Sequence, residues 1–205
     1  TQEPLILNNG RLIPYWPCRS GVLVSGDTAY FACSLLPWRP SYLCAVNAKT
    51  GTPDGPGRFV RQLDSVTIEA ALLETSTQLI APQGRVPPTV LNRENGKPLG
   101  ALEGGGGSRV TVAASGDIVH GPGNKTGWIT VSDLATFEGK RTFQDCAAMV
   151  VDRSTAYLLS DTLLTAVELT SGRELWRANA SFPHDIILAG GTLFVGGNDE
   201  VAAFR

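Results

Sequence analysis

The segment AMVVDRSTAYLLS, residues 148–160, decides the fold, because it consists of an apolar strand, a short polar turn and a second apolar strand. Apolar and polar residues alternate around the turn, which is typical of β-strands. The Asp-Arg-Ser turn has the composition of a tight hairpin. The same unit recurs as GVLVSGDTAYFAC (21–33), AALLETSTQLIAP (70–82), RVTVAASGDIVHG (109–121) and DIILAGGTLFVGG (185–197). The sequence therefore predicts a hairpin that is repeated along the chain.

The copies recur at a nearly constant interval. Their turns end at Thr28, Thr77, Gly116, Thr155 and Thr192, which are 49, 39, 39 and 37 residues apart. A second series follows with the same period, as CAVNAKTG (44–51), TVLNRENG (89–96), ITVSDLAT (129–136), TAVELTSG (165–172) and EVAAFR (200–205). A period of about 40 residues is that of a propeller blade. Because stacking around an axis covers the two apolar faces of each sheet, we predict an all-β chain, a β-propeller of four-stranded antiparallel blades.

We expect one propeller domain over residues 1–205, with about five blades at approximately 11–62, 63–104, 105–143, 144–179 and 180–205. The fifth copy is shorter than a full blade. Two interpretations are open: the chain is a fragment of a larger ring, or a strand within residues 1–10 closes a small one. An open fragment would expose sheet edges, which favour self-association. The glycine run at 104–107 is expected to be a flexible connector between blades.

A family resemblance lies in the second series. The segment AVELTSGRELW, residues 166–176, closely resembles the A-x-D-x-x-T-G-x-x-x-W motif of the PQQ-type, quinoprotein alcohol dehydrogenase-like propellers of bacteria. The segments at 44–51 and 89–99 resemble the same motif without its Trp, and the third copy is degenerate. The resemblance implies that Gly172 ends a turn and that Trp176 docks onto the neighbouring blade. It also favours the fragment, because this family closes rings of seven or eight blades.

The resemblance implies the fold rather than the cofactor. Quinoprotein dehydrogenases use a vicinal cysteine pair, a calcium-binding set of Glu, Asn and Asp, and a catalytic Asp. The four cysteines here, Cys18, Cys33, Cys44 and Cys146, are not adjacent and have no metal-ligand spacing. We therefore expect no metal and no cofactor; PQQ and Ca²⁺ enter only if catalytic residues lie outside this chain. Cys33 and Cys44 flank a predicted loop, and their disulfide state is left open.

Composition excludes two classes of partner. The formal net charge is −2 and the basic residues are scattered, unlike the basic stripe of a nucleic-acid-binding protein. The longest apolar runs, about four to six residues, are far shorter than the roughly 20 that cross a bilayer. Because residue 1 already lies in sequence that we expect to be folded, we expect any targeting segment or lipid anchor to lie before Thr1. By analogy with exported members of the family, such as outer-membrane assembly lipoproteins, we expect a periplasmic or otherwise exported protein, with a cytoplasmic location still open.

Two regions are candidate binding sites. His184 and Asp185 precede an innermost strand, and the starts of such strands lie near the channel mouth, where propellers usually bind ligands. Neighbouring residues of a strand point to opposite faces, so a direct His–Asp dyad is disfavoured. His120 ends a strand and is a weaker candidate of the same kind. Trp38 and Arg39, in the loop SLLPWRPSY (34–42), form a potential contact patch; alternatively, the loop folds its Trp over the blade edge.

The sequence thus predicts a non-catalytic β-propeller scaffold or binding module of a larger bacterial protein. Its partner would be another protein or the remaining blades of the same polypeptide. Two alternatives stay open. One is a part of a quinoprotein-like oxidoreductase with catalytic residues elsewhere, and the other is a carbohydrate- or peptide-binding propeller. A fold by itself does not decide among them.

Overall fold

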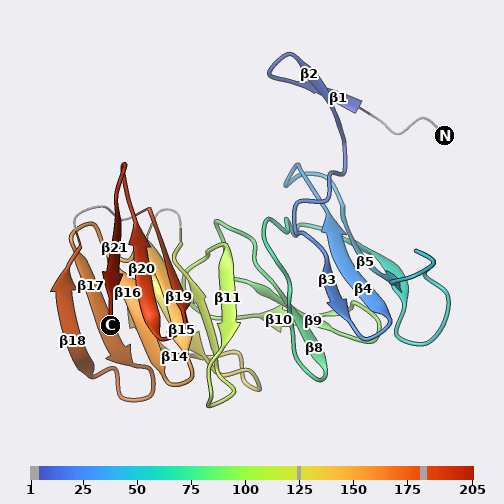
Figure 1. Cartoon of the computed structure of the whole chain (residues 1–205). Helices are drawn as coiled ribbons and strands as arrows, with labels where there is room; N and C mark the ends of the chain where they lie inside the picture. Colours follow the sequence, from blue (N-terminus) through green and yellow to red (C-terminus); the bar gives the residue numbers. More distant parts are fainter. Residues whose placement is uncertain (1–4, 124–125, 181–183) are drawn as a thin grey trace. The chain divides into compact units, whose positions relative to one another are not determined.

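The computed structural model of the chain describes residues 5–123, 126–180 and 184–205, and all regular structure in these residues is β-strand. The strands form six antiparallel sheets (Figure 1). In every sheet the hydrogen-bonded neighbours are consecutive in the chain, so each sheet is a simple meander. The described residues contain no helix long and apolar enough to cross a membrane. The predicted all-β class is confirmed.

Four of the sheets have four strands each, and their bounds follow the repeat. The first contains β3 (Leu23–Ser25), β4 (Thr28–Cys33), β5 (Ser41–Asn47) and β6 (Phe59–Leu63), and the second contains β7 (Leu73–Glu74), β8 (Gln78–Ala81), β9 (Thr89–Asn92) and β10 (Pro98–Ala101). The third contains β11 (Arg109–Val112), β12 (Ile118–Gly121), β13 (Ile129–Ser132) and β14 (Gly139–Phe143), and the fourth contains β15 (Ala148–Asp152), β16 (Thr155–Leu159), β17 (Leu163–Glu168) and β18 (Glu174–Asn179). The fifth has three strands, β19 (Asp185–Ala189), β20 (Thr192–Gly196) and β21 (Val201–Phe204).

The chain divides into two compact units. The first unit holds the first two of these sheets, up to Gly84 and over Pro88–Ala101. One face of the first sheet packs against one face of the second, because alternate residues of a strand point to the same side. Their shared apolar core contains Tyr30, Ala32, Leu43, Ala45, Leu63, Ile68, Leu72, Leu79, Ala81 and Leu91.

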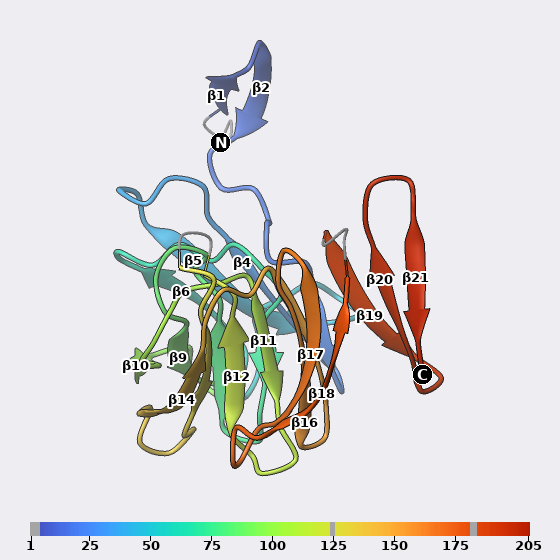
Figure 2. The same ribbon diagram turned by 90° about the vertical axis from the view of Figure 1, so that its left-hand side faces the viewer.

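The second unit, Arg85–Pro87 and Leu102–Arg205, holds the third, fourth and fifth sheets. The fourth sheet is covered on both faces. Leu158 of β16 belongs to the core shared with the third sheet, and the next residue, Leu159, belongs to the core shared with the fifth. Figure 2 shows β19–β21 standing beside β16–β18. Period-two alternation of two apolar faces therefore produces a stack of sheets.

A side-chain cap shapes the turn between the third and fourth strands of each complete sheet. In the first three, the Oδ1 atom of Asn47, Asn92 or Asp133 accepts hydrogen bonds of 2.8–3.2 Å from two following backbone N–H groups. Asn and Asp favour such turns because their short side chains reach the backbone of the next residues. In the fourth sheet Glu168 occupies this position and accepts from the Ser171 hydroxyl instead.

The same turns close through a residue with positive φ. The N–H groups of Gly51, Gly96 and Gly172 donate at 2.7–2.8 Å to the carbonyl four residues earlier, with φ values of 67–73°. Glycine favours this region because it lacks a Cβ atom. In the degenerate third copy, Phe137 takes the position with a φ of 68° and makes the same bond at 2.9 Å. Hydrogen bonding thus preserves the turn where the motif's glycine is absent.

The described N-terminal residues do not form the ring-closing strand of the second interpretation. β1 (Leu5–Asn8) pairs with β2 (Arg11–Pro14) in a separate hairpin, so among the described residues of segment 1–10 no strand joins the fifth sheet. The first four-stranded sheet accordingly begins at Leu23 rather than at residue 11. The hairpin has a local cause. Asn9 and Gly10, with φ of 47° and 76°, form the two-residue turn that suits hairpins, and short loops close at small entropic cost.

Gly96 and Gly51 occupy equivalent turns, but their surroundings differ, so alanine should affect stability differently at the two positions. A Cβ atom at Gly96 would overlap the Phe59 ring of the first sheet, whereas a Cβ at Gly51 would meet nothing within 4 Å. Both glycines have similar φ, so the backbone penalty of alanine is shared. We expect Gly96→Ala to lower the free energy of unfolding by about 1–3 kcal/mol more than Gly51→Ala. Urea unfolding of both variants measures this, and equal losses would contradict the contact.

Candidate functional site

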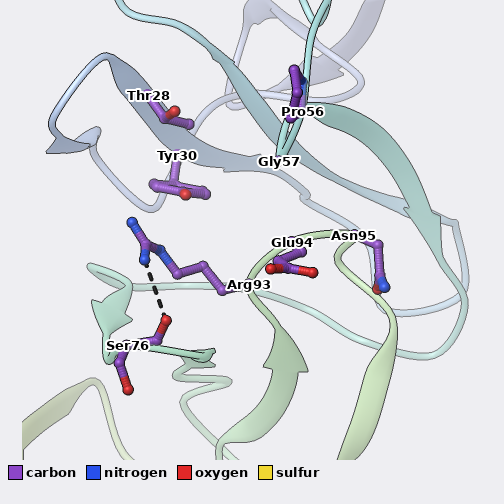
Figure 3. A pocket seen from close by; sticks show the side chains of 8 residues that line it. All are labelled: Thr28, Tyr30, Pro56, Gly57, Ser76, Arg93, Glu94 and Asn95. Carbon is purple, nitrogen blue, oxygen red and sulfur yellow. Dashed lines mark hydrogen bonds between the residues drawn. The ribbon is translucent and has the colours of Figure 1, made fainter.

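A pocket of about 550 Å³ lies at one end of the first unit (Figure 3). Its walls come from the connections β3–β4, β5–β6, β7–β8 and β9–β10, because an antiparallel meander brings alternate turns to the same end of the sheets. Pockets of this volume hold small ligands. The lining residues are Thr28, Tyr30, Pro56, Gly57, Ser76, Arg93, Glu94 and Asn95.

An ion pair between Arg93 and Glu74 holds the Arg93 side chain in place in this pocket. Figure 3 shows Arg93 reaching from the turn after β9 towards Tyr30 and Ser76, and its Nη1 donates to the Ser76 carbonyl at 3.3 Å. Its Nη2 lies 2.6 Å from Glu74 Oε1, which also accepts from the Ser25 hydroxyl at 2.9 Å. The Glu74 side chain is only 17% exposed, so solvent screens the pair weakly. The positive charge is thereby balanced within the protein, and the pocket offers mainly hydrogen-bonding groups.

The loop 34–40 lies at the opposite end of the first sheet, between the end of β4 and the start of β5. Trp38 is 74% exposed there. The Arg39 N–H donates to the Leu36 carbonyl at 3.0 Å, and the Arg39 guanidinium carbon is 5.5 Å from the centroid of the Tyr15 ring. The alternative that the loop folds its tryptophan over the blade edge is therefore wrong, because the Trp38 ring lies in solvent.

Aromatic contacts hold the base of this loop. Trp16 Nε1 donates to the Pro40 carbonyl at 2.8 Å. The Trp16 ring meets the Tyr42 ring edge-on, with centroids 5.5 Å apart and planes at 79°. Edge-on aromatic pairs are favourable because the positive edge of one ring faces the negative face of the other. These contacts fix the C-terminal end of the loop, and Trp38 projects from it.

His184 and Asp185 form no dyad. His184 Nε2 lies 2.7 Å from Asn198 Oδ1, whereas Asp185 pairs with Arg109 Nη2 at 2.5 Å. Arg109 also donates to the Met149 carbonyl at 3.3 Å, so it connects the first strands β11, β15 and β19 of three successive sheets. Both predicted residues are exposed. The arrangement links blades, and among the residues that the structure describes the His184 ring is paired with the Asn198 amide and with no carboxylate.

The structure places His120 inside the core, so its prediction as a binding residue is wrong. His120 is fully buried, with Nε2 3.0 Å from the Ser132 hydroxyl oxygen. That hydroxyl also donates to the Glu103 carbonyl at 3.2 Å, and Nδ1 is left without a well-aligned partner among the described residues. Burial lowers the pKa of His120 to about 4, and backbone groups of Glu103 and Gly105 oppose this effect in part.

The glycine run beside His120 is packed rather than flexible, contrary to our expectation. Gly105, Gly106 and Gly107 are buried. A Cβ atom at Gly107 would lie 2.5 Å from the Gly121 Cα atom, so the two backbones are nearly in contact. Glycine permits such an approach because it has no side chain. Sequence alone could not distinguish this packing from a flexible connector.

Trp176 is 38% exposed, and its ring lies 6.0 Å from Tyr157 of its own sheet. The prediction of a buried docking tryptophan is wrong, because β18 is the outer strand of its sheet and most of its residues are exposed. Arg141 of the preceding sheet makes the contact instead, with Nη2 donating to the Thr170 carbonyl at 3.3 Å. A Cβ atom at Gly172 would overlap that guanidinium, so glycine makes room for it. Arg141 was not among the residues predicted from the sequence.

The residues present do not fit the calcium and PQQ site of quinoprotein dehydrogenases. Within residues 5–123, 126–180 and 184–205, no three His, Cys, Asp or Glu side chains gather closely enough to hold a metal ion. Calcium takes six to eight oxygen ligands, so such a gathering is required.

The cysteine beside a second pocket is a poor nucleophile. This pocket, of about 480 Å³, lies in the second unit and is lined in part by Asp145, Cys146 and Asp161. Burial, and secondarily the Asp145 charge, raises the pKa of Cys146 to about 11. Only the thiolate is a strong nucleophile, and at neutral pH this thiol stays protonated.

Comparison with known proteins supports the fold. No protein-family model and no curated protein matches the chain. Among solved structures, the crystal structure of BamB from Moraxella catarrhalis is similar, with a TM-score of 0.71 and 17% sequence identity over 97% of this chain and 60% of that chain. The chain thus spans about 60% of the length of this structure. The likeness confirms the β-propeller fold that the repeat predicted.

The buried histidine predicts a pH dependence of stability. Between pH 6.5, the ordinary pKa of a histidine, and about 4, the unfolded chain binds a proton that folded His120 does not. The free energy of unfolding should therefore fall as the pH falls through this window, by about 2 kcal/mol between pH 7 and pH 5. His120→Gln should lack this component. Urea unfolding at both pH values measures it, and identical pH dependence of the two proteins would contradict the burial of a neutral ring.

The ion pair between Arg93 and Glu74 predicts that substitutions at the two positions have non-additive effects on the free energy of unfolding. Arg93→Met keeps the aliphatic stem but leaves Glu74 partly buried without its cation, so we expect a loss of about 1–3 kcal/mol in the free energy of unfolding. Adding Glu74→Gln should recover part of the loss, because the uncompensated charge disappears. Urea unfolding in a double-mutant cycle measures the coupling, and strictly additive losses would show that the two side chains act separately.

Proposed function

We propose that the chain is a non-catalytic binding module of a larger exported β-propeller protein, and that the loop 34–40 contacts a protein partner. The exposure of Trp38, at 74%, carries this proposal. Tryptophan and arginine dominate the energetics of protein interfaces because they combine large apolar area with directed polar groups. Here they are neighbours, Trp38 and Arg39, at the tip of one connection.

The loop is already arranged for binding. The hydrogen bond from Trp16 to Pro40 and the packing of Trp16 on Tyr42 fix its base. A partner that receives Trp38 therefore orders few additional residues, which favours affinity. The ring and the neighbouring cation are best complemented by an apolar cleft with carboxylates at its rim.

The two described pockets favour binding over nucleophilic chemistry. The charge of Arg93 in the larger pocket is balanced by Glu74, and the Cys146 thiol beside the other pocket is held in its protonated form. The Arg93 pocket is where a carbohydrate or peptide would bind under the alternative interpretation, because its walls present hydroxyl and amide groups. It lacks an exposed aromatic platform comparable to Trp38, so the loop is the stronger candidate.

Photo-crosslinking tests the proposal in cells that make the full-length protein. A benzophenone amino acid replaces Trp38 in one variant and Leu99 in another, because Leu99 of β10 is also exposed, at 47%. We expect a discrete adduct with one protein from position 38, none from position 99, and loss of the adduct when Arg39→Glu is added. No adduct from position 38, or the same adducts from both positions, would contradict a specific contact.

A parallel assay addresses the oxidoreductase alternative. Full-length protein is mixed with PQQ and Ca²⁺, and dye-linked alcohol oxidation is followed. We expect no turnover above the protein-free mixture. Turnover by the protein would contradict the non-catalytic proposal.

A further inference from the structure

Three thiols gather near the base of the Trp38 loop. The segment before β3 runs antiparallel to the end of β4, and the Ser34 N–H donates to the Pro17 carbonyl at 3.2 Å. This pairing places Cys18 directly opposite Cys33. Cys44 of β5 is the third thiol, and a hydrogen bond joins it to Cys33.

The backbone geometry favours a bond between Cys18 and Cys33. The hydrogen bond between Ser34 and Pro17 joins the residues that flank the cysteines, so the cysteines themselves are a non-hydrogen-bonded antiparallel pair. In such pairs the Cα atoms lie about 4.5 Å apart and the side chains are at their closest. This separation falls within the Cα range of disulfides, about 4.4–6.8 Å.

Cys44 is less well placed than Cys18 to form a disulfide with Cys33. It pairs with Phe31, so it is a diagonal neighbour of Cys33. Diagonal residues are about 7–8 Å apart, beyond the distance that a disulfide spans without movement of the backbone. The hydrogen bond with Cys33, followed by burial, raises the pKa of the Cys44 thiol. Cys44 therefore remains a protonated neighbour.

The solvent accessibility of the three thiols also favours a bond between Cys18 and Cys33. Cys18 is exposed, Cys33 is half-buried and Cys44 is buried. A reagent from solution reaches Cys18 first, and the next thiol within reach of Cys18 is Cys33.

We propose that Cys18 and Cys33 form a disulfide by exchange with a disulfide-bearing oxidant. The Cys18 thiolate attacks one sulfur of the oxidant, whose S–S bond breaks, and the first leaving thiolate takes up the proton that Cys18 lost. The Cys33 thiolate then attacks the Cys18 sulfur, and the second half of the oxidant leaves as a thiol with the proton from Cys33. Two protein thiols are oxidised by two electrons, and one oxidant disulfide is reduced to two thiols.

The bond would fasten the segment that carries Trp16 to β4. Trp16 in turn supports Pro40 and Tyr42 at the base of the loop. Exported proteins meet disulfide oxidants, whereas cytosolic thiols are kept reduced. The inference rests on strand pairing, so it stands even if the Trp38 loop binds no partner.

Peptide mapping tests the linkage. The full chain is treated in native buffer with oxidised glutathione, blocked with an alkylating reagent and digested for mass spectrometry. We expect one intramolecular bond, Cys18 to Cys33, with Cys44 and Cys146 alkylated only after denaturation. Cys18→Ser should abolish the bond, and the matched variant Cys44→Ser should leave it intact. A Cys33–Cys44 bond, a persistent glutathione adduct on Cys18, or no bond would overturn the proposal.

Thermal unfolding tests the effect of the bond on stability without peptide mapping. The oxidised wild-type protein should unfold at a higher temperature than the reduced protein, because the bond restricts the unfolded chain. Reductant should leave the melting temperature of Cys18→Ser unchanged. If reductant has no effect on the oxidised wild-type protein, the bond does not fasten the segment to β4.

Discussion

The structure depends on the covering of each apolar sheet face by the next sheet. Strands that send apolar side chains to both sides cannot be stable as single sheets in water. In the first unit, Tyr30 and Leu43 of one sheet meet Leu79 and Leu91 of the other. In the second unit the fourth sheet is enclosed on both faces. Each fully buried leucine contributes about 1.5–3 kcal/mol, so the stacking supplies most of the stability of these units.

This constraint explains why the sequence predicts the strands so well. Hairpins and their turns are determined by residues a few positions apart, and the caps at Asn47, Asn92 and Asp133 could be recognised as recurring polar marks. The Asn9-Gly10 dipeptide is likewise a local hairpin signal, which our prediction for residues 1–10 did not include. Local pairing prevailed because a two-residue loop closes at little entropic cost.

The errors have a different origin. The burial of His120 depends on a glycine run and on Ser132, and the exposure of Trp176 depends on the position of β18 at the outside of its sheet. Arg141 takes over the docking role that the motif assigned to a tryptophan. Such outcomes are set by contacts between different sheets, which periodicity within one strand does not report. Sequence therefore predicted the elements better than it predicted the side chains that join them.

The two ends of the first sheet show how a rigid stack can carry function in its connections. At one end, Glu74 balances the charge of Arg93 within the protein. At the other end, Trp16 is engaged by Tyr42 and Pro40, and Tyr15 is covered by Arg39. The Trp38 ring lies in solvent beside these contacts, and burial against a second molecule would remove its apolar area from water.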